Sequence, residues 1–387
     1  MFPYFLFLTS LYFVFIGELF YKKTNSKYLL LISFIIIIIF VGLRYKIGND
    51  WYSYELYMRD VPSLFSAQEI KNPDLIQFEY GFIFLMSFFK TISLDPDFQL
   101  AGLTLLISAT NYLCLFYIAK RTPEIRYKNL FIFIAIALNF FRDVDVLRQS
   151  IVTYASVFLL YRYNKSFAKY LLSIILLSLI HFSAIFLIPF YFFTKSIFNK
   201  KVIIAAIFLL PISQLFNYFS DAGILGFIIP HIPFYSEKFQ NYLIEYPSGG
   251  LGLSFLIYMG ILIFVYFNWK NLNKMSILSI YFVNLFLLTI YIYIVFNIKE
   301  VADRFAYMFQ FGTAFLMVII FQKYLLKNTK YLLFLIIFIF FFFCFRFYRV
   351  LQVPVTESVF VPYRNILFYE HSDDLEIYKN ILDKQVK

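Results

Sequence analysis

Long apolar runs separated by short polar loops make up most of the chain. The runs Leu29–Leu43, Met275–Ile298 and Tyr331–Phe345 approach or exceed the roughly 20 apolar residues that a helix needs to cross a bilayer. Segments such as ISFIIIIIFV do not alternate apolar with polar residues, which excludes an outer-membrane barrel. The pattern predicts an all-α polytopic membrane protein.

The boundaries of the apolar runs predict about 11–13 transmembrane or re-entrant helices. Met1–Tyr21 is expected to be a first span, not a removed signal peptide, because no basic residue precedes its apolar run. The further apolar segments are Gly81–Phe89, Phe98–Ala119, Leu130–Phe141, Leu147–Tyr161, Tyr170–Ile180, Phe182–Phe193, Val202–Phe219, Leu251–Phe267 and Phe305–Phe321.

Residues 1–347 are interpreted as a single integral-membrane domain, and 348–387 as a polar C-terminal tail. Short lysine-rich loops are placed on the cytoplasmic side, which leaves two longer external loops at about 44–77 and 220–250. The topology of residues 44–128 stays open: either Gly81–Phe89 only dips into the membrane, or Leu64–Phe78 contains a re-entrant element.

Composition supports the membrane interpretation, since hydrophobic residues are 61% and charged residues 15% of 387 positions. The net charge of +11 comes mostly from short basic loops, so it indicates membrane topology and not nucleic-acid binding. Cys114 and Cys344 lie within apolar runs and are expected to be inert core residues.

Several charged residues stand where apolar spans end, and the assumed topology places them on the external face. The first group is Arg44 with Asp50; the alternative is that Arg44 only anchors the end of a span. The second group is Arg142, Arg148 and Gln149, with Arg148 and Gln149 expected in the first turn of a helix that begins near Val146. Its alternative is a neutral loop in which Asp143 and Asp145 pair with the two arginines.

His181 and the pair Asp303 and Arg304 complete the candidates. His181 stands alone in apolar sequence, so it is either a hydrogen-bonded core residue or a proton acceptor; His231 is a weaker rival for that role. Asp303 and Arg304 form either a salt-bridged loop or part of a site at the mouth of a span.

Arginine and histidine on one face suit the handling of a pyrophosphate and of one proton. Guanidinium groups match phosphate oxygens in a bidentate way and stay charged, while imidazole titrates near neutral pH. The sequence has no HxxxH motif and no cysteine cluster, so neither a metal nor a cofactor is expected.

The motifs LRYKIGNDWYSY, FEYGF, LRQSI, IHFSAIFLIPFYFF, DRFAYMF and a late VPY resemble the EpsG-type branch of the O-antigen polymerase (Wzy) family. This resemblance implies a GT-C-like helical bundle and a glycosyltransferase in the bacterial inner membrane. The enzyme would join undecaprenyl-pyrophosphate-linked repeat units into polysaccharide on the external face. A chain-length regulator and a flippase are candidate partners.

The resemblance assigns roles to individual residues. His181, Arg148 and Arg304 are expected to be catalytic. Substrate binding is expected of Arg44, Glu79, Asp50, Arg142, Gln149 and Asp303. Three other activities stay open: a glycosyltransferase that uses polyprenyl-phosphate sugars with Asp50 as base, a flippase of lipid-linked glycans, and an acyltransferase with His181 as base.

Overall fold

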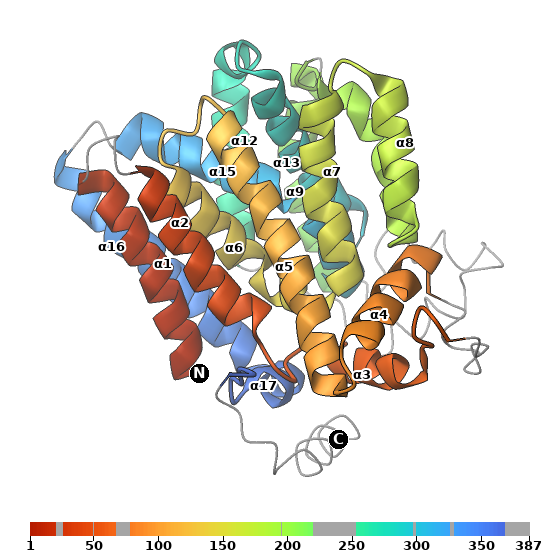
Figure 1. The fold of residues 1–387 in the computed structure, drawn as a ribbon. Coiled ribbons are helices and arrows are strands. Elements are labelled where there is room, and N and C mark those ends of the chain that lie inside the picture. Colours follow the sequence, from red (N-terminus) through yellow and green to blue (C-terminus); the bar gives the residue numbers. More distant parts are fainter. Residues whose placement is uncertain are drawn as a thin grey trace. The chain divides into compact units, whose positions relative to one another are not determined.

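The computed structural model describes residues 1–20, 26–48, 50–66, 78–194, 196–219, 253–296, 299–325 and 329–367. Within these ranges the chain forms α-helices, with a few short 3₁₀ and π-helical segments and no β-strand (Figure 1). The predicted all-α fold class is therefore confirmed. The expected external loop 220–250, including His231, and residues 368–387 lie outside the described residues.

Contacts within the chain divide it into two compact units. Unit 1 consists of Met1–Arg121, Tyr127–Tyr191 and Asn328–Lys387. Unit 2 consists of Thr122–Arg126 and Phe192–Lys327. The interpretation of residues 1–347 as one integral-membrane domain stays a prediction.

Unit 1 contains helices from both ends of the chain. α1 packs against α2, α6 and α16, while α5 packs against α4 and α7, so the N-terminal and C-terminal helices share one core. The helices of this unit are α1 (Phe2–Phe20), α2 (Ser26–Ile37), α3 (Trp51–Asp60), α4 (Tyr80–Ile92), α5 (Pro96–Arg121), α6 (Lys128–Asp145), α7 (Leu147–Tyr163), α8 (Phe167–Ser178), α16 (Thr329–Leu351) and α17 (Pro354–Phe360).

The helical conformation is interrupted at one residue between α6 and α7. Val146 has φ −103° and ψ 70°, outside the helical region, so α6 ends at Asp145 and α7 begins at Leu147. The prediction of a helix that begins near Val146 is confirmed. Arg148 and Gln149 consequently lie in the first turn of α7.

Helix α8 and the 3₁₀ segment η4 (Phe182–Thr194) form the short pair expected around His181. The hydroxyl of Tyr170 donates to the Leu187 carbonyl at 2.9 Å, which ties α8 to η4. A 3₁₀ helix rises about 2.0 Å per residue, so η4 covers roughly 26 Å, more than an α-helix of its length would. Segment η4 therefore spans a greater length than an α-helix over the predicted run Phe182–Phe193 would.

Unit 2 is built around α13 (Ile277–Val295), which packs against α9 (Lys200–Phe219) and α15 (Gln310–Ile320). Glu124 caps the start of α13, accepting hydrogen bonds from the Ser276 N–H at 2.6 Å and the Ser279 hydroxyl at 2.7 Å. The remaining elements of this unit are α12 (Leu253–Leu272), α14 (Lys299–Tyr307) and η6 (Phe321–Leu325).

One expected span differs from the structure. The sequence predicted the run Phe305–Phe321 as a single helix that follows a short loop with the sequence KEVADR. In the structure those loop residues form the start of α14, and the helical conformation is interrupted after Tyr307 before α15 begins at Gln310. Helix α14 is amphipathic, since Ala302 and Ala306 are buried while Arg304 is exposed. Hydropathy alone therefore missed it.

Four of the described helices are long and apolar enough to cross a membrane: Phe2–Phe20, Asp97–Arg121, Ser254–Leu272 and Ile277–Val295. The protein is thus a multi-pass membrane protein. Helix α4 has 13 residues, or about 20 Å at 1.5 Å per residue, against a hydrocarbon core of roughly 30 Å. This length favours the interpretation in which the segment after Glu79 only dips into the membrane.

Gly312 permits the close packing of α15 on α13. A Cβ at this position would overlap the backbone of α13 at the Phe282 carbonyl oxygen and the Phe286 nitrogen. Backbone atoms cannot move aside as side chains do, so we expect Gly312→Ala to destabilise the protein by about 1–3 kcal/mol. The measurement is the unfolding temperature of the purified protein in detergent.

Gly260 provides the matched control for that experiment. A Cβ there would meet nothing within 4 Å, so Gly260→Ala should leave the unfolding temperature unchanged or raise it slightly. Equal unfolding temperatures for the Gly312→Ala and Gly260→Ala proteins would contradict the proposed packing.

Candidate functional site

Arg44 is buried in unit 1, with 1% of its surface exposed. Its Nη1 donates to the Val41 carbonyl at 2.6 Å, and its Nη2 donates to the Val144 carbonyl at 3.1 Å. The side chain therefore joins the end of the second span to the last turn of α6. Because the two terminal guanidinium nitrogens donate to backbone oxygens, Arg44 fixes the backbone around the site.

Gly48 brings the LRYKIGND motif against the break between α6 and α7. It has φ +106°, which favours glycine, and a Cβ there would lie 3.1 Å from the Val144 carbonyl oxygen and 3.2 Å from Asp145 Oδ1. The chain therefore turns tightly at this glycine. Asp50 follows two residues later, as the N-cap residue of α3.

The VPYRNIL segment, residues 361–367, pairs with the same loop. The Tyr45 N–H donates to the Arg364 carbonyl at 3.1 Å, and the Ile366 N–H donates to the Leu43 carbonyl at 3.0 Å. Arg364 Nη1 in turn donates to the Lys46 carbonyl at 3.0 Å. Sequence reasoning noted the late VPY only as part of a resemblance, and did not predict that it would contact the Arg44 loop.

This segment also satisfies carbonyl groups that a π-helical turn leaves open. In η2 (Ile38–Gly42) the chain departs from α-helical pairing. Asn365 Nδ2 donates to the Ile39 carbonyl at 2.8 Å, and the Tyr363 hydroxyl donates to the Phe40 carbonyl at 2.7 Å. The two ends of unit 1 are thereby joined around Arg44.

The structure brings Arg148 and His181 together through Glu79. Arg148 Nη1 lies 2.8 Å from Glu79 Oε2, and His181 Nδ1 lies 2.9 Å from Glu79 Oε1. The exposed fractions of the three side chains are 22% for Arg148, 18% for Glu79 and 26% for His181. We call these three residues the Glu79 cluster. Its side chains are mostly buried, but part of each is accessible to solvent.

Gly81 explains how Glu79 reaches His181. The Gly81 N–H donates to the Leu179 carbonyl at 2.7 Å, and a Cβ at Gly81 would lie only 2.6 Å from that oxygen. The start of α4 therefore lies directly against the turn that precedes His181. Glu79 also accepts a hydrogen bond from the Phe182 N–H at 2.8 Å, so this turn is fixed from both sides.

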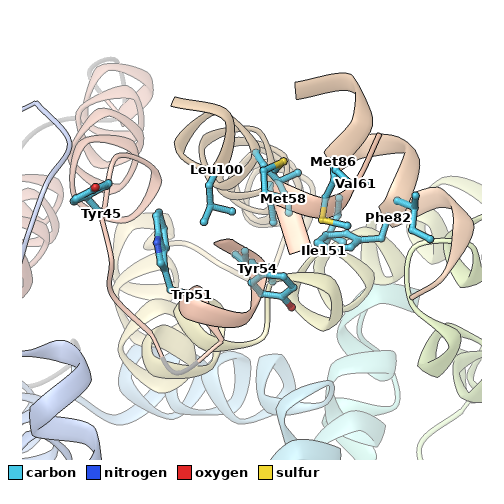
Figure 2. Packing of buried hydrophobic residues seen from close by; sticks show 13 residues of the cluster. Tyr45, Trp51, Tyr54, Met58, Val61, Phe82, Met86, Leu100 and Ile151 are labelled. Atoms are coloured by element: carbon cyan, nitrogen blue, oxygen red, sulfur yellow. The ribbon is translucent and has the colours of Figure 1, made fainter. Parts of the chain in front are cut away.

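An aromatic and aliphatic cluster lies beside the charged groups. Arg148 lies over the Phe78 ring, with its guanidinium carbon 4.2 Å from the ring centroid. Figure 2 shows the buried residues next to it, among them Tyr54 on α3, Phe82 on α4 and Ile151 on α7. Because these side chains are packed, the arginine is held on a rigid surface.

Hydrogen bonds and charge keep Glu79 ionised. Burial by itself raises the pKa of this carboxyl, but hydrogen bonds from His181 and the Phe182 N–H, together with the Arg148 charge, lower the pKa to about 2. Burial also raises the pKa of the Tyr54 hydroxyl to about 12, with the Asp50 charge acting in the same direction and Arg148 opposing it. Asp50 and Arg148 thus act on the same hydroxyl.

The alternative of a neutral loop, in which Asp143 and Asp145 pair with the two arginines, does not hold for Arg148. Asp143 Oδ2 accepts hydrogen bonds from the hydroxyls of Tyr154 at 2.7 Å and Tyr112 at 3.2 Å. Arg148 is paired with Glu79. The carboxylate partner of Arg148 is therefore Glu79, the residue before α4, and sequence reasoning did not predict this pairing.

The remaining candidates are not members of the Glu79 cluster. Arg142 is half-buried near the end of α6, and Gln149 is buried in the first turn of α7. In unit 2, the Tyr293 hydroxyl donates to Asp303 Oδ1 at 2.8 Å, and Arg304 is exposed on α14. The expected meeting of Arg304 with Arg148 and His181 stays a prediction. Among the described residues no three His, Cys, Asp or Glu side chains gather as metal ligands.

The fold and this site define a multi-pass α-helical membrane protein that carries a partly buried arginine, carboxylate and histidine cluster. The model of the EpsG family matches residues 27–365, which is most of the chain. The chain therefore belongs to the EpsG family. Searches of the curated proteins and of the solved structures gave no match. The GT-C-like arrangement and the kinship with Wzy polymerases stay predictions.

Replacement of Arg44 tests its structural role. Arg44→Ala would leave the carbonyls of Val41 and Val144 without these partners, at a cost of about 1–3 kcal/mol for each buried group. We expect the Arg44→Ala protein to have a lower unfolding temperature in detergent than the Arg162→Ala protein. Arg162 is the control because its side chain is exposed, near the C-terminal end of α7. An unchanged unfolding temperature together with lost activity would instead support the substrate-binding role predicted from sequence.

The lowered pKa of Glu79 predicts a pH-dependent contribution to stability. A carboxylate with a depressed pKa stabilises the folded state fully above its ordinary pKa of 4.5, and this contribution disappears as the pH falls through about 2. The gap in unfolding temperature between wild type and Glu79→Gln should therefore be constant above pH 4.5 and shrink below it. A gap of the same size at pH 3 would contradict the ion pairs.

Proposed function

We propose that the protein is a polysaccharide polymerase of the bacterial inner membrane. It joins undecaprenyl-pyrophosphate-linked oligosaccharide repeat units into O-antigen, capsule or exopolysaccharide on the external face. Membership of the EpsG family supports a role in exopolysaccharide synthesis. The observation that carries the proposal is that His181 and Arg148 contact the same carboxylate, so a proton acceptor and an anion-binding group stand side by side.

His181 is the general base in this proposal. Its Nδ1 faces Glu79, and Nε2 has no hydrogen-bond partner among the described residues. A sugar hydroxyl that approaches Nε2 can give up its proton there while its oxygen attacks the donor sugar. Histidine suits this step because it changes protonation near neutral pH.

Arg148 is the group that stabilises the departing diphosphate. One guanidinium nitrogen, Nη1, is held by Glu79, and the side chain keeps 22% of its surface exposed. A phosphate oxygen is the kind of acceptor that a guanidinium prefers, so a diphosphate can bind at the exposed part of this side chain.

The proposed step balances as an inverting transfer. The acceptor hydroxyl oxygen forms a bond to the anomeric carbon of the donor as the bond from that carbon to the pyrophosphate oxygen breaks. The pyrophosphate leaves with the electron pair, and the hydroxyl proton passes to His181 Nε2. Arg148 stabilises the charge that develops on the leaving oxygen.

The other candidates have supporting roles in the proposal. Arg44 holds the loop that leads to Asp50, and Asp50 orients a sugar or the cationic groups near Tyr54. Arg142 and Gln149 extend the anion-binding edge beside Arg148. Arg304 and Asp303, on α14, are the further candidates for catalysis and for substrate binding.

Replacement of the two central residues tests the activity. His181→Ala and Arg148→Ala should each abolish long chains and leave single repeat units on the lipid, because one loses the base and the other the anion contact. The measurement is the ladder of lipid-linked products formed by purified protein in liposomes. Arg162→Ala, at the exposed end of the same helix α7, is the matched control and should give a normal ladder.

Other outcomes separate the alternatives. Normal ladders from both central variants at normal expression would overturn the proposal. A glycosyltransferase that uses polyprenyl-phosphate sugars with Asp50 as base predicts that Asp50→Asn is more damaging than Arg148→Ala. A flippase predicts transfer of lipid-linked glycan across the liposome membrane without any new glycosidic bond.

A further inference from the structure

Three structural elements meet at the single side chain of Glu79. The carboxylate belongs to the residue that precedes α4, Oε2 bonds to Arg148 on α7, and Oε1 bonds to both His181 and the Phe182 N–H after α8. Each oxygen therefore faces a different functional group. A residue that only bound substrate would be expected to point toward the substrate and away from these two side chains.

We propose that Glu79 is the positioning residue of the site, an inference that rests on the proposed polymerase function. It holds His181 in the tautomer whose Nε2 lone pair can accept a proton, and it fixes the guanidinium of Arg148 at a set distance from that nitrogen. Glu79 acts through these two side chains and does not touch the reacting atoms.

The tautomer follows from the chemistry of the carboxylate. With a pKa near 2, Glu79 is ionised at neutral pH and can only accept hydrogen bonds. Neutral imidazole carries one N–H, so the 2.9 Å contact requires that the proton be on Nδ1. The Nε2 lone pair is then the one available to a sugar hydroxyl.

The same carboxylate suits the charge that appears during transfer. When Nε2 receives the proton, the imidazolium lies against an ionised Glu79 at 2.9 Å, which stabilises the charged form. At the same moment a diphosphate gains negative charge beside Arg148. Glu79 therefore contacts both the new cation and the arginine that faces the new anion.

No other acidic or amide side chain reproduces this geometry. Aspartate is shorter by one methylene and cannot span the same two contacts from this backbone position. Glutamine has the right length, but its NH₂ group would face either the guanidinium of Arg148 or the Phe182 N–H, and both are donors. Both variants should therefore lose function while they keep a side chain of similar volume.

The first readout is independent of catalysis. In protein labelled with ¹⁵N-histidine, the His181 ring nitrogens should show the Nδ1-protonated tautomer, with His181→Ala used to assign the signal. An amide can present either its oxygen or its NH₂ to the ring, so Glu79→Gln should give a mixture of both tautomers. A wild-type signal from the Nε2-protonated tautomer would overturn the positioning role.

The second readout is the rate of glycan polymerisation. Tyr54 on α3, and Asp50, which precedes α3, are titratable groups that interact electrostatically with Arg148 or with each other beside this site. Loss of the Glu79 charge should lower the maximal rate by at least about 10-fold, up to about 10⁴-fold for a fully lost orienting carboxylate.

Combined variants separate positioning from simple stability. In a His181→Ala background, Glu79→Gln should cause little further loss, since the group that it positions is gone. Additive losses would overturn the inference. If the tautomer signals are as expected but wild-type protein makes no polymer, the proposed function is wrong while the geometry stands.

Discussion

A charge that is largely buried among apolar helices must find its partners within the protein, because little water reaches it to replace them. The ion pairs of Glu79 show how unit 1 meets this constraint. One carboxylate, at the point where a short helix begins, compensates a guanidinium and orients an imidazole. Arg44 meets the same constraint with backbone carbonyls. Arg44 and Arg148 both stand at the ends of apolar runs in the sequence. In the structure Arg44 is a buried structural residue, whereas Arg148 lies in a partly exposed site.

Hydropathy and span-end charges were sufficient to predict much of unit 1. The all-α fold, the break near Val146 and the position of Arg148 in a first helical turn followed from local pattern alone. The partner of Arg148 did not, because Glu79 is distant in sequence and reaches it only through the close contact of Gly81 with Leu179. Such an approach depends on the absence of one Cβ, which no periodicity reveals. Amphipathic α14 escaped prediction for a related reason, since its charged face resembles a loop.

Glycine has the same function at several places in this protein. Gly48 lets a loop lie against Asp145, Gly81 lets α4 begin beside Leu179, and Gly312 lets α15 lie against the backbone of α13. In each case a missing side chain sets how closely two backbones approach. The polar chemistry of the site therefore depends on residues that carry no chemistry of their own, and a search restricted to charged residues would overlook them.

The pairing of the VPYRNIL segment with the Arg44 loop has a consequence for biosynthesis. Lys46 and Arg364 are 318 residues apart in the chain, and ribosomes add about 5–20 residues per second. The loop that holds Arg44 is therefore made roughly 16–60 seconds before the segment that completes it. During that interval the nascent protein has its first helices but lacks the VPYRNIL segment that pairs with them, so unit 1 reaches its final form only after that segment has been made.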